Sequence, residues 1–305
     1  MPKHLVRIIF LLLVLQWSAS GLQAQILEPD TVFHKKRLLW VTGVEGTLWA
    51  GSLVALHQAW YKDYSTGNFH FFNDSKEWMQ VDKVGHATTT YFVGKIGYDM
   101  LRWAGVSEQH SILWGGSLGL FYMTSIELFD AYSDGWGFSW SDMAANVAGA
   151  GLFMGQQALW HEQRIFMKYS FHTTEYAEYR PDLLGNTLAE QLVKDYNGHT
   201  YWLSANIYSF LDEQSRFPKW LMVSAGYGAE GMLGGFENPD EHDGVPLPYY
   251  DRYRQYYLSL DVDLTRIPVR SKFLRGLFHV LSFIKVPMPA VEFSEKGTKF
   301  YPLYF

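Results

Sequence analysis

The chain has 305 residues, of which 18% are charged and 17% aromatic, with a formal net charge of −6 and no cysteine. The lack of cysteine excludes disulfides, thiol catalysis, cysteine-ligated metals and a lipid-bearing cysteine. A negative charge without any basic block argues against nucleic acid as a partner. Few charges and many Trp and Tyr residues are typical of proteins at a membrane interface, so the composition favours an envelope protein over a cytosolic one.

The N-terminus has the pattern of a secretory signal peptide. Lys3 and Arg7 precede an uninterrupted apolar run at 8–15, and small and polar residues then lead to a cleavage site near Ala24. The apolar run is about half of the ~20 residues that a membrane-spanning helix needs, which favours cleavage over an uncleaved anchor. We therefore expect residues 1–24 to be removed and the mature protein to be exported.

Four long apolar segments without proline predict four helices, over about 38–61, 81–105, 111–129 and 141–168. Ser139 is a good N-cap for the last of them. The short connections make consecutive helices antiparallel, which predicts a helical bundle.

Small residues recur at four-residue spacing in the last two of these helices, as Gly115 and Gly119 in one and Gly151 and Gly155 in the other. Such stripes let helix backbones approach closely in lipid. In water each glycine would cost a helix about 1 kcal/mol relative to alanine. The stripes therefore favour a membrane-associated bundle, with a tightly packed soluble bundle as the alternative.

The pattern changes after the fourth helix. Residues 180–198 predict a short amphipathic helix, and segments 201–211, 219–233 and 255–267 have strand character, the last with strict alternation of apolar and polar residues. Three or four strands cannot close a barrel. We therefore expect a small sheet or hairpin layer against the helices.

These patterns predict a mainly α protein. Its parts are a signal peptide at 1–24, a four-helix membrane-associated bundle at 38–170, and a C-terminal α+β extension at 171–305 with a short helix and a few antiparallel strands. Export together with an aromatic, strand-rich tail favours the outer membrane or the periplasmic face of the envelope.

Three polar pairs share helix faces because their members are three or four residues apart. In an antiparallel bundle, the start of the second helix, the end of the third and the start of the fourth lie at one level. The topology therefore predicts one polar cluster at one end of the bundle, made up of Asp82, His86, Glu127, Asp130, Asp142 and Asn146.

Several kinds of chemistry fit such a cluster. A histidine with carboxylates could hold a divalent metal or perform acid–base catalysis, and carboxylates with an amide could bind a headgroup or a sugar. The structural alternative is that Asp82 and Asp142 cap helices, that His86 bonds to a neighbour, and that Glu127 and Asp130 pair with Lys83 or Arg164. No HExxH, GxSxG or phosphate-loop spacing is present, so the sequence identifies no cofactor, no metal and no catalytic residue.

The segments DKVGH at 82–86 and IELFDAYSDGWGFSWSDMAANVAGA at 126–150, together with Tyr91 and Gln156, resemble the DUF2279 family, which includes YfiM-like envelope lipoproteins. The DKxxH, ExxD and DxxxN elements also resemble, distantly, the VanZ-like membrane proteins. The resemblance covers roughly residues 40–170 and selects the same six residues of the polar cluster. It implies an envelope location and no established reaction. Unlike the lipoprotein members, this chain has no cysteine to acylate.

We therefore expect an exported envelope protein, non-enzymatic, whose polar cluster binds a lipid headgroup or a glycan. The expected partner is membrane lipid, with an envelope glycan or an outer-membrane protein as further candidates and no nucleic acid. The alternative is a metal-dependent or acid–base hydrolase that acts on a lipid or a cell-wall precursor.

Overall fold

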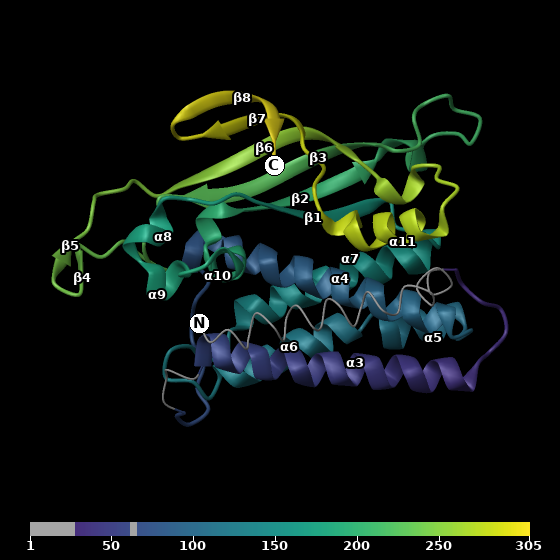
Figure 1. Ribbon diagram of the computed structural model, residues 1–305, viewed down its shortest axis with the longest axis horizontal. Helices are drawn as coiled ribbons and strands as arrows, with labels where there is room; N and C mark the ends of the chain where they lie inside the picture. Colours follow the sequence, from purple (N-terminus) through teal and green to yellow (C-terminus); the bar gives the residue numbers. More distant parts are fainter. Residues whose placement is uncertain (1–27, 62–65) are drawn as a thin grey trace.

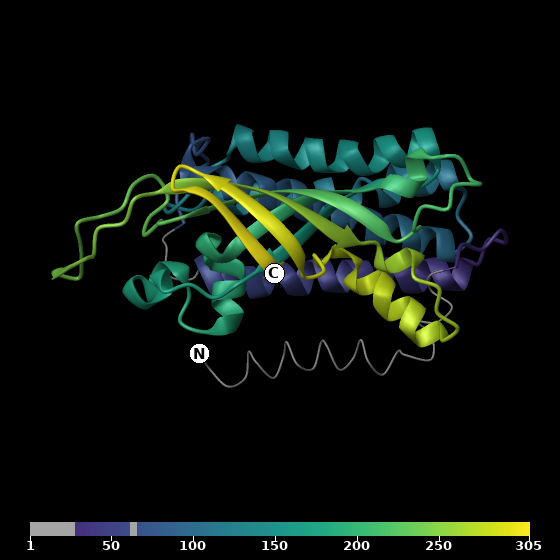
Figure 2. The same cartoon turned by 90° about the horizontal axis from the view of Figure 1, so that it is seen from above.

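The structure, a computed structural model, describes residues 28–61 and 66–305, and in it a layer of helices lies beneath an antiparallel sheet (Figure 1). Seen from above, the strands cross the helices obliquely (Figure 2), and the side view shows β7 and β8 on the far side of the sheet from the helices (Figure 1). The longest helices are α3 (Lys35–Leu56), α4 (Val81–Trp103), α6 (Leu118–Asp130) and α7 (Trp140–Trp160). A π-helical turn, His57–Tyr61, follows α3, and α5 (Glu108–His110) with the turn Ser111–Gly115 precedes α6.

The sheet has six strands in the order β1-β2-β3-β6-β7-β8, and all neighbouring strands are antiparallel. They are β1 (Ile165–Phe171), β2 (His199–Asn206), β3 (Leu221–Glu230), β6 (Tyr253–Val262), β7 (Met288–Ser294) and β8 (Gly297–Tyr304). The connections carry short elements: α8 (Tyr176–Tyr179), α9 (Pro181–Leu184) and α10 (Leu188–Lys194), the hairpin of β4 (Glu241–His242) and β5 (Val245–Pro246), and α11 (Lys272–Val280).

The prediction of a mainly α, four-helix membrane-associated bundle with a few trailing strands was wrong. The chain is about 48% helical and 22% strand, and the six strands form a layer of their own. The fourth helix ends at Trp160, because His161 takes a left-handed conformation with φ +58°. The apolar segment that follows is β1, and a short apolar run cannot be assigned to helix or strand by its periodicity.

Membrane-spanning character is limited to two stretches of the described residues. Lys35–Leu56 and Glu108–Asp130 are long and apolar enough to cross a membrane, judged by length and composition alone. The predicted signal peptide lies outside the described residues.

Helix α4 is the centre of the helical layer because glycines bring its neighbours into backbone contact. A β-carbon on Gly119 of α6 would lie 2.0 Å from the Thr90 carbonyl oxygen, and one on Gly149 of α7 would lie 2.1 Å from that of Ala87. Gly115 also contacts α4. Any larger residue at these positions would force the helices apart.

The second predicted glycine pair has no such role. A β-carbon on Gly151 or Gly155 would meet nothing within 4 Å, so this stripe lies on the open side of α7. The close contact of α7 comes from Gly149 instead.

The sheet packs on the start of α4 through a mixed aromatic core. Trp78 and Val81, which open the helix, contact Tyr201 of β2 and the buried Met232 and Leu233 that follow β3. The sheet therefore fixes the end of the helical layer at which the polar residues gather.

Candidate functional site

Lys83 lies at the centre of a group of buried acidic side chains at the start of α4. Its Nζ atom is 2.7 Å from Asp74 Oδ2, 2.8 Å from Asp82 Oδ2 and 2.8 Å from Asp142 Oδ1. The four side chains are each at most 10% exposed. One ammonium group thus joins the loop before α4, α4 itself and the start of α7.

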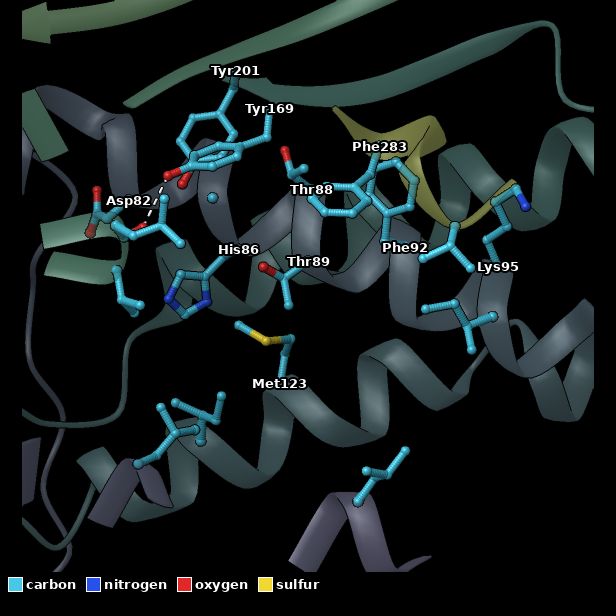
Figure 3. Close-up of a pocket in the computed structure, with 18 of the residues that line it drawn as sticks. Asp82, His86, Thr88, Thr89, Phe92, Lys95, Met123, Tyr169, Tyr201 and Phe283 are labelled. Carbon is cyan, nitrogen blue, oxygen red and sulfur yellow. Dashed lines mark hydrogen bonds between the residues drawn. The ribbon is translucent and has the colours of Figure 1, made fainter. Parts of the chain in front are cut away.

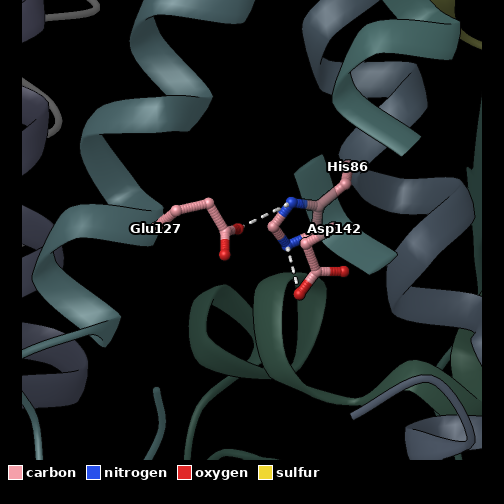
Figure 4. Close-up of side chains that lie close together, drawn as sticks. All are labelled: His86, Glu127 and Asp142. Atoms are coloured by element: carbon pink, nitrogen blue, oxygen red, sulfur yellow. Dashed lines mark ion pairs between the residues drawn. The ribbon is translucent and has the colours of Figure 1, made fainter. Parts of the chain in front are cut away.

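His86, one turn further along α4, lies between two carboxyl groups (Figure 4). Its Nδ1 is 3.5 Å from Glu127 Oε1 of α6, and its Nε2 is 4.0 Å from Asp142 Oδ2 of α7. Glu127 is completely buried, and its Oε2 accepts the backbone N–H of Ser139 at 3.2 Å. Within the part of the chain that the structure describes, Glu127 Oε1 and His86 Nδ1 have no hydrogen-bond partner.

The other two residues predicted for the cluster lie at its edges. Asp130 Oδ1 accepts the hydroxyl of Tyr61 at 2.5 Å. Asn146 is fully buried, its Oδ1 accepts the hydroxyl of Thr90 at 3.1 Å, and it contacts the imidazole of His86.

Helix capping places the carboxylate of Asp142. Ser139 caps α7, as predicted: its Oγ accepts the backbone N–H of Asp142 at 3.0 Å. The hydroxyls of Ser139 and Ser141 donate to Asp74 Oδ1 at 2.5 and 2.6 Å. The same cap therefore binds the loop carboxylate to the helix start.

A strained turn places Asp82 and Lys83. Trp78, Met79 and Gln80 have φ values of +48°, +51° and +69°, a conformation that L-residues rarely adopt. The sheet layer holds this turn, since the hydroxyl of Tyr227 donates to the Met79 carbonyl and Arg254 donates to Gln80 Oε1 at 2.7 Å. Strain of this kind persists only where the surrounding structure over-determines it.

Burial shifts the pKa values of the titratable groups in the polar cluster. Burial lowers the pKa of His86 to about 4, and the Lys83 ammonium adds to this effect. Burial, together with the negative charges of Asp142 and Asp130, raises the pKa of Glu127 to about 9. Burial and a hydrogen bond with Asp74 raise the pKa of Asp142 to about 8. Burial thus favours the neutral form of the imidazole and of both flanking carboxyl groups.

The polar cluster opens into a cavity of ≈1510 Å³ that follows α4 (Figure 3). Asp82, His86 and Asp142 line one end of it. The walls beyond them are mainly apolar and come from α3, α4, α6 and α11, with lining residues that include Leu39, Trp40, Val44, Leu48, Phe92, Ile96, Met123, Leu277, Val280 and Phe283.

A second polar group lines the same cavity further along α4. Lys95 Nζ lies 2.8 Å from Asp99 Oδ2 and 2.7 Å from Nε2 of His279, which is on α11. The same His279 nitrogen is 2.8 Å from Asp99 Oδ2. This group holds one acidic and two basic side chains, so Asp99 has its cationic partner within the group.

Sequence reasoning found most of the cluster but missed two of its members. Asp74 lies in a loop, where no helical period marks it, and Lys83 was considered only as a partner for Glu127 or Asp130. The structure pairs Lys83 with Asp74, Asp82 and Asp142 instead.

The comparisons with known proteins bear on the helical layer. Residues 69–155 match the family model DUF2279, described as a predicted periplasmic lipoprotein. No curated protein and no solved structure matches the chain. The predicted resemblance to DUF2279 is thus confirmed over a shorter span than 40–170, while the YfiM-like and VanZ-like resemblances stay predictions.

The matched span contains Asp74, Lys83 and all six residues predicted for the polar cluster. The family description also supports the predicted location. The 305 residues contain no cysteine that could carry the lipid of a lipoprotein. The chain is an exported protein of the cell envelope with a DUF2279 region at residues 69–155.

Proposed function

We propose that the protein binds a membrane lipid in the cavity along α4, with the headgroup at the polar cluster and an acyl chain against the apolar walls. One observation carries this proposal: a single cavity of ≈1510 Å³ joins the acidic end of α4 to a long apolar wall. This volume exceeds the 300–1,000 Å³ that is typical of sites for drug-sized ligands.

The length of the cavity suits a hydrocarbon chain. Asp82 and Lys95, which line its two polar regions, are thirteen residues apart on α4, or about 20 Å at 1.5 Å per residue. One leaflet of a bilayer has a hydrocarbon depth of about 15 Å, half of the full core. A glycan would fill the polar end only and would leave the apolar walls in water.

The acidic end favours a headgroup that donates hydrogen bonds. Asp74, Glu77, Asp82, Asp130 and Asp142 all line the cavity. Lys83 pairs with Asp74, Asp82 and Asp142 but not with Glu77 or Asp130. Carboxyl oxygens accept hydrogen bonds, and those to an ammonium group are the stronger ones. We therefore expect a lipid with a primary ammonium headgroup to bind better than one with an uncharged or anionic headgroup.

The test is lipid capture with a charge placed on the apolar wall. Ile96 lines the cavity and Leu159 does not, although both are exposed apolar residues on helices. The Ile96→Glu and Leu159→Glu variants are incubated with mixed phosphatidylethanolamine and phosphatidylglycerol vesicles and re-isolated, and bound lipid is measured by mass spectrometry.

We expect wild type and Leu159→Glu to retain phosphatidylethanolamine, and Ile96→Glu to retain at least about tenfold less, because covering a carboxylate with an acyl chain costs more than about 1.4 kcal/mol. Equal retention by the two variants, or no lipid on the wild type, would contradict the proposal.

A hydrolase acting on such a lipid is the second candidate, and one observation favours it. His86, held between two carboxyl groups, lines the cavity, where it could act as a base toward a bound ester. This candidate requires release of fatty acid or headgroup from lipid incubated with wild type, and loss of that release in His86→Ala.

A further inference from the structure

His86 Nδ1 and Glu127 Oε1 face each other at 3.5 Å, and neither has a hydrogen-bond partner among the described residues. This separation is too long for a good hydrogen bond. Glu127 is completely buried, so its free oxygen cannot be satisfied by bulk water. The acceptor oxygen and the ring nitrogen are therefore both available to a bound ion.

The separation fits two ligands of one metal ion. Atoms bound at about 2.1 Å to a tetrahedral ion lie about 3.4 Å from each other. Asp142 supplies a third donor, since one ligand atom from each of His86, Glu127 and Asp142 can be chosen so that all three lie within 4.8 Å of one another. We propose that these three side chains bind one divalent transition-metal ion of the Zn²⁺ class.

The neighbouring acidic group shows why the ion belongs at His86. Asp74, Glu77 and Asp82 also bring three carboxyl oxygens within 4.8 Å. The Lys83 ammonium lies 2.7–2.8 Å from two members of that group, Asp74 and Asp82. In the group of His86, Glu127 and Asp142 the ammonium reaches only Asp142 Oδ1, while Asp142 Oδ2 faces His86. This second group also supplies an imidazole, which is a metal ligand when neutral.

The ion would keep one position open toward the cavity. Three protein ligands and a fourth, exchangeable position are the arrangement of catalytic zinc sites. His86 and Asp142 both line the cavity, whereas Glu127 lies behind them. An oxygen of a molecule in the cavity could therefore occupy the fourth position. The metal site rests on its own geometry and does not require lipid binding.

The test measures metal alone on the full, tag-free chain. Zn²⁺ binding is followed by calorimetry and by metal analysis after gel filtration, and Co²⁺ serves as a visible-absorption probe of ligand geometry. Glu127→Gln removes a ligand charge while keeping the acceptor for the Ser139 N–H. Asp130→Asn is the matched control, a carboxyl three residues further along α6 that accepts from Tyr61 instead.

We expect one Zn²⁺ per wild-type and Asp130→Asn chain, binding weakened about 100-fold or more in Glu127→Gln, and a tetrahedral Co²⁺ spectrum that Glu127→Gln abolishes. His86→Gln is the second variant should Glu127→Gln fail to fold, and it should show the same loss. A wild type that binds well below one Zn²⁺, or equal losses in Glu127→Gln and Asp130→Asn, would overturn the proposal. Lipid capture is repeated in EDTA to separate the two proposals. Lipid that is retained without metal supports the lipid site whatever the result of the Zn²⁺ measurement.

Discussion

Two completely buried carboxyl groups, Asp261 in the sheet and Glu127 in the helical layer, are satisfied very differently. Asp261 Oδ2 pairs with Lys168 Nζ at 2.9 Å and accepts the hydroxyl of Ser204 at 2.9 Å. Its Oδ1 accepts the backbone N–H groups of Val262 at 2.7 Å and Val286 at 3.1 Å. Both carboxylate oxygens of Asp261 therefore have donors from within the chain.

Glu127 has one hydrogen-bond donor, the Ser139 N–H, and an unsatisfied oxygen that faces the unsatisfied nitrogen of His86. Native proteins leave few buried polar atoms unpaired, and each case needs an explanation. We interpret Asp261 as a carboxylate that stabilises the fold and Glu127 as a carboxyl group with an oxygen available to a ligand. Four changes test this distinction.

The largest effect should come from Lys168→Met. This change removes the ammonium group and leaves Asp261 charged and buried, which should cost about 3–5 kcal/mol in the free energy of unfolding. The measurement is a urea titration at neutral pH. Lys36→Met, at an exposed position of α3, is the control and should stay within about 0.5 kcal/mol of wild type. If Lys168→Met unfolds at the same urea concentration as wild type, the ammonium group of Lys168 is not needed to stabilise buried Asp261.

Asp99 is a second carboxylate with partners inside the protein, and its contribution to the free energy of unfolding should depend on pH. Burial alone would raise the pKa of Asp99, but Lys95 and His279 hold it at about 2. A folded-state pKa below the unfolded value gives stability that is present above about pH 4 and lost as the pH falls toward 2. Asp99→Asn should therefore lose about 2 kcal/mol at pH 7 and much less at pH 2. A difference that does not change with pH would contradict the assignment.

Glu77, whose pKa burial raises instead of lowering, should show the opposite slope. Burial and the negative charge of Asp82 raise the pKa of Glu77 to about 7. A raised pKa gives stability that is fully present below about pH 4.5 and lost as the pH rises through 7. The free energy of unfolding of wild type relative to Glu77→Gln should fall by the order of 1 kcal/mol over that range. A rise between pH 4.5 and 7 would contradict a raised pKa of Glu77.

The smallest effect on stability should come from Glu127→Gln in metal-free protein. Burial raises the pKa of Glu127 and so favours the protonated carboxyl group when no metal is bound, which makes the amide a close replacement whose NH₂ group can donate to His86 Nδ1. We expect a change of no more than about 0.5 kcal/mol in thermal or chemical unfolding. A loss as large as that of Lys168→Met would make Glu127 a structural residue.

The helical layer could be predicted from the sequence because its signals are local. The second helix was expected over 81–105 and runs over Val81–Trp103, and the Ser139 cap was found where predicted. Once three helices and two short connections are known, the antiparallel arrangement brings their polar ends together. The juxtaposition of Asp82, His86, Glu127 and Asp142 followed from that argument.

The sheet and the cavity could not be predicted in the same way. The alternation seen in β6 is real, but its polar side is the buried one: Asp261 is inside, while Leu258 is 53% exposed. The usual assumption that apolar residues face the core fails here because Lys168, more than ninety residues away in the chain, satisfies Asp261. Pairings of this kind depend on strand register, which no local pattern in the sequence specifies.

The glycine contacts of α4 also determine how a bound molecule could leave. Backbone contact at Gly119 and Gly149 gives α4 no space to slide against α6 or α7. Helix α3 is attached differently, through side chains such as Val41 packed on Leu101, and its own glycines have open space around them. One wall of the cavity is thus in backbone contact with its neighbours, and the opposite wall is attached by side chains, which include the Trp49 indole that donates to Ser125 of α6. We therefore expect α3 to yield more readily than α6 or α7 when a molecule enters or leaves the cavity.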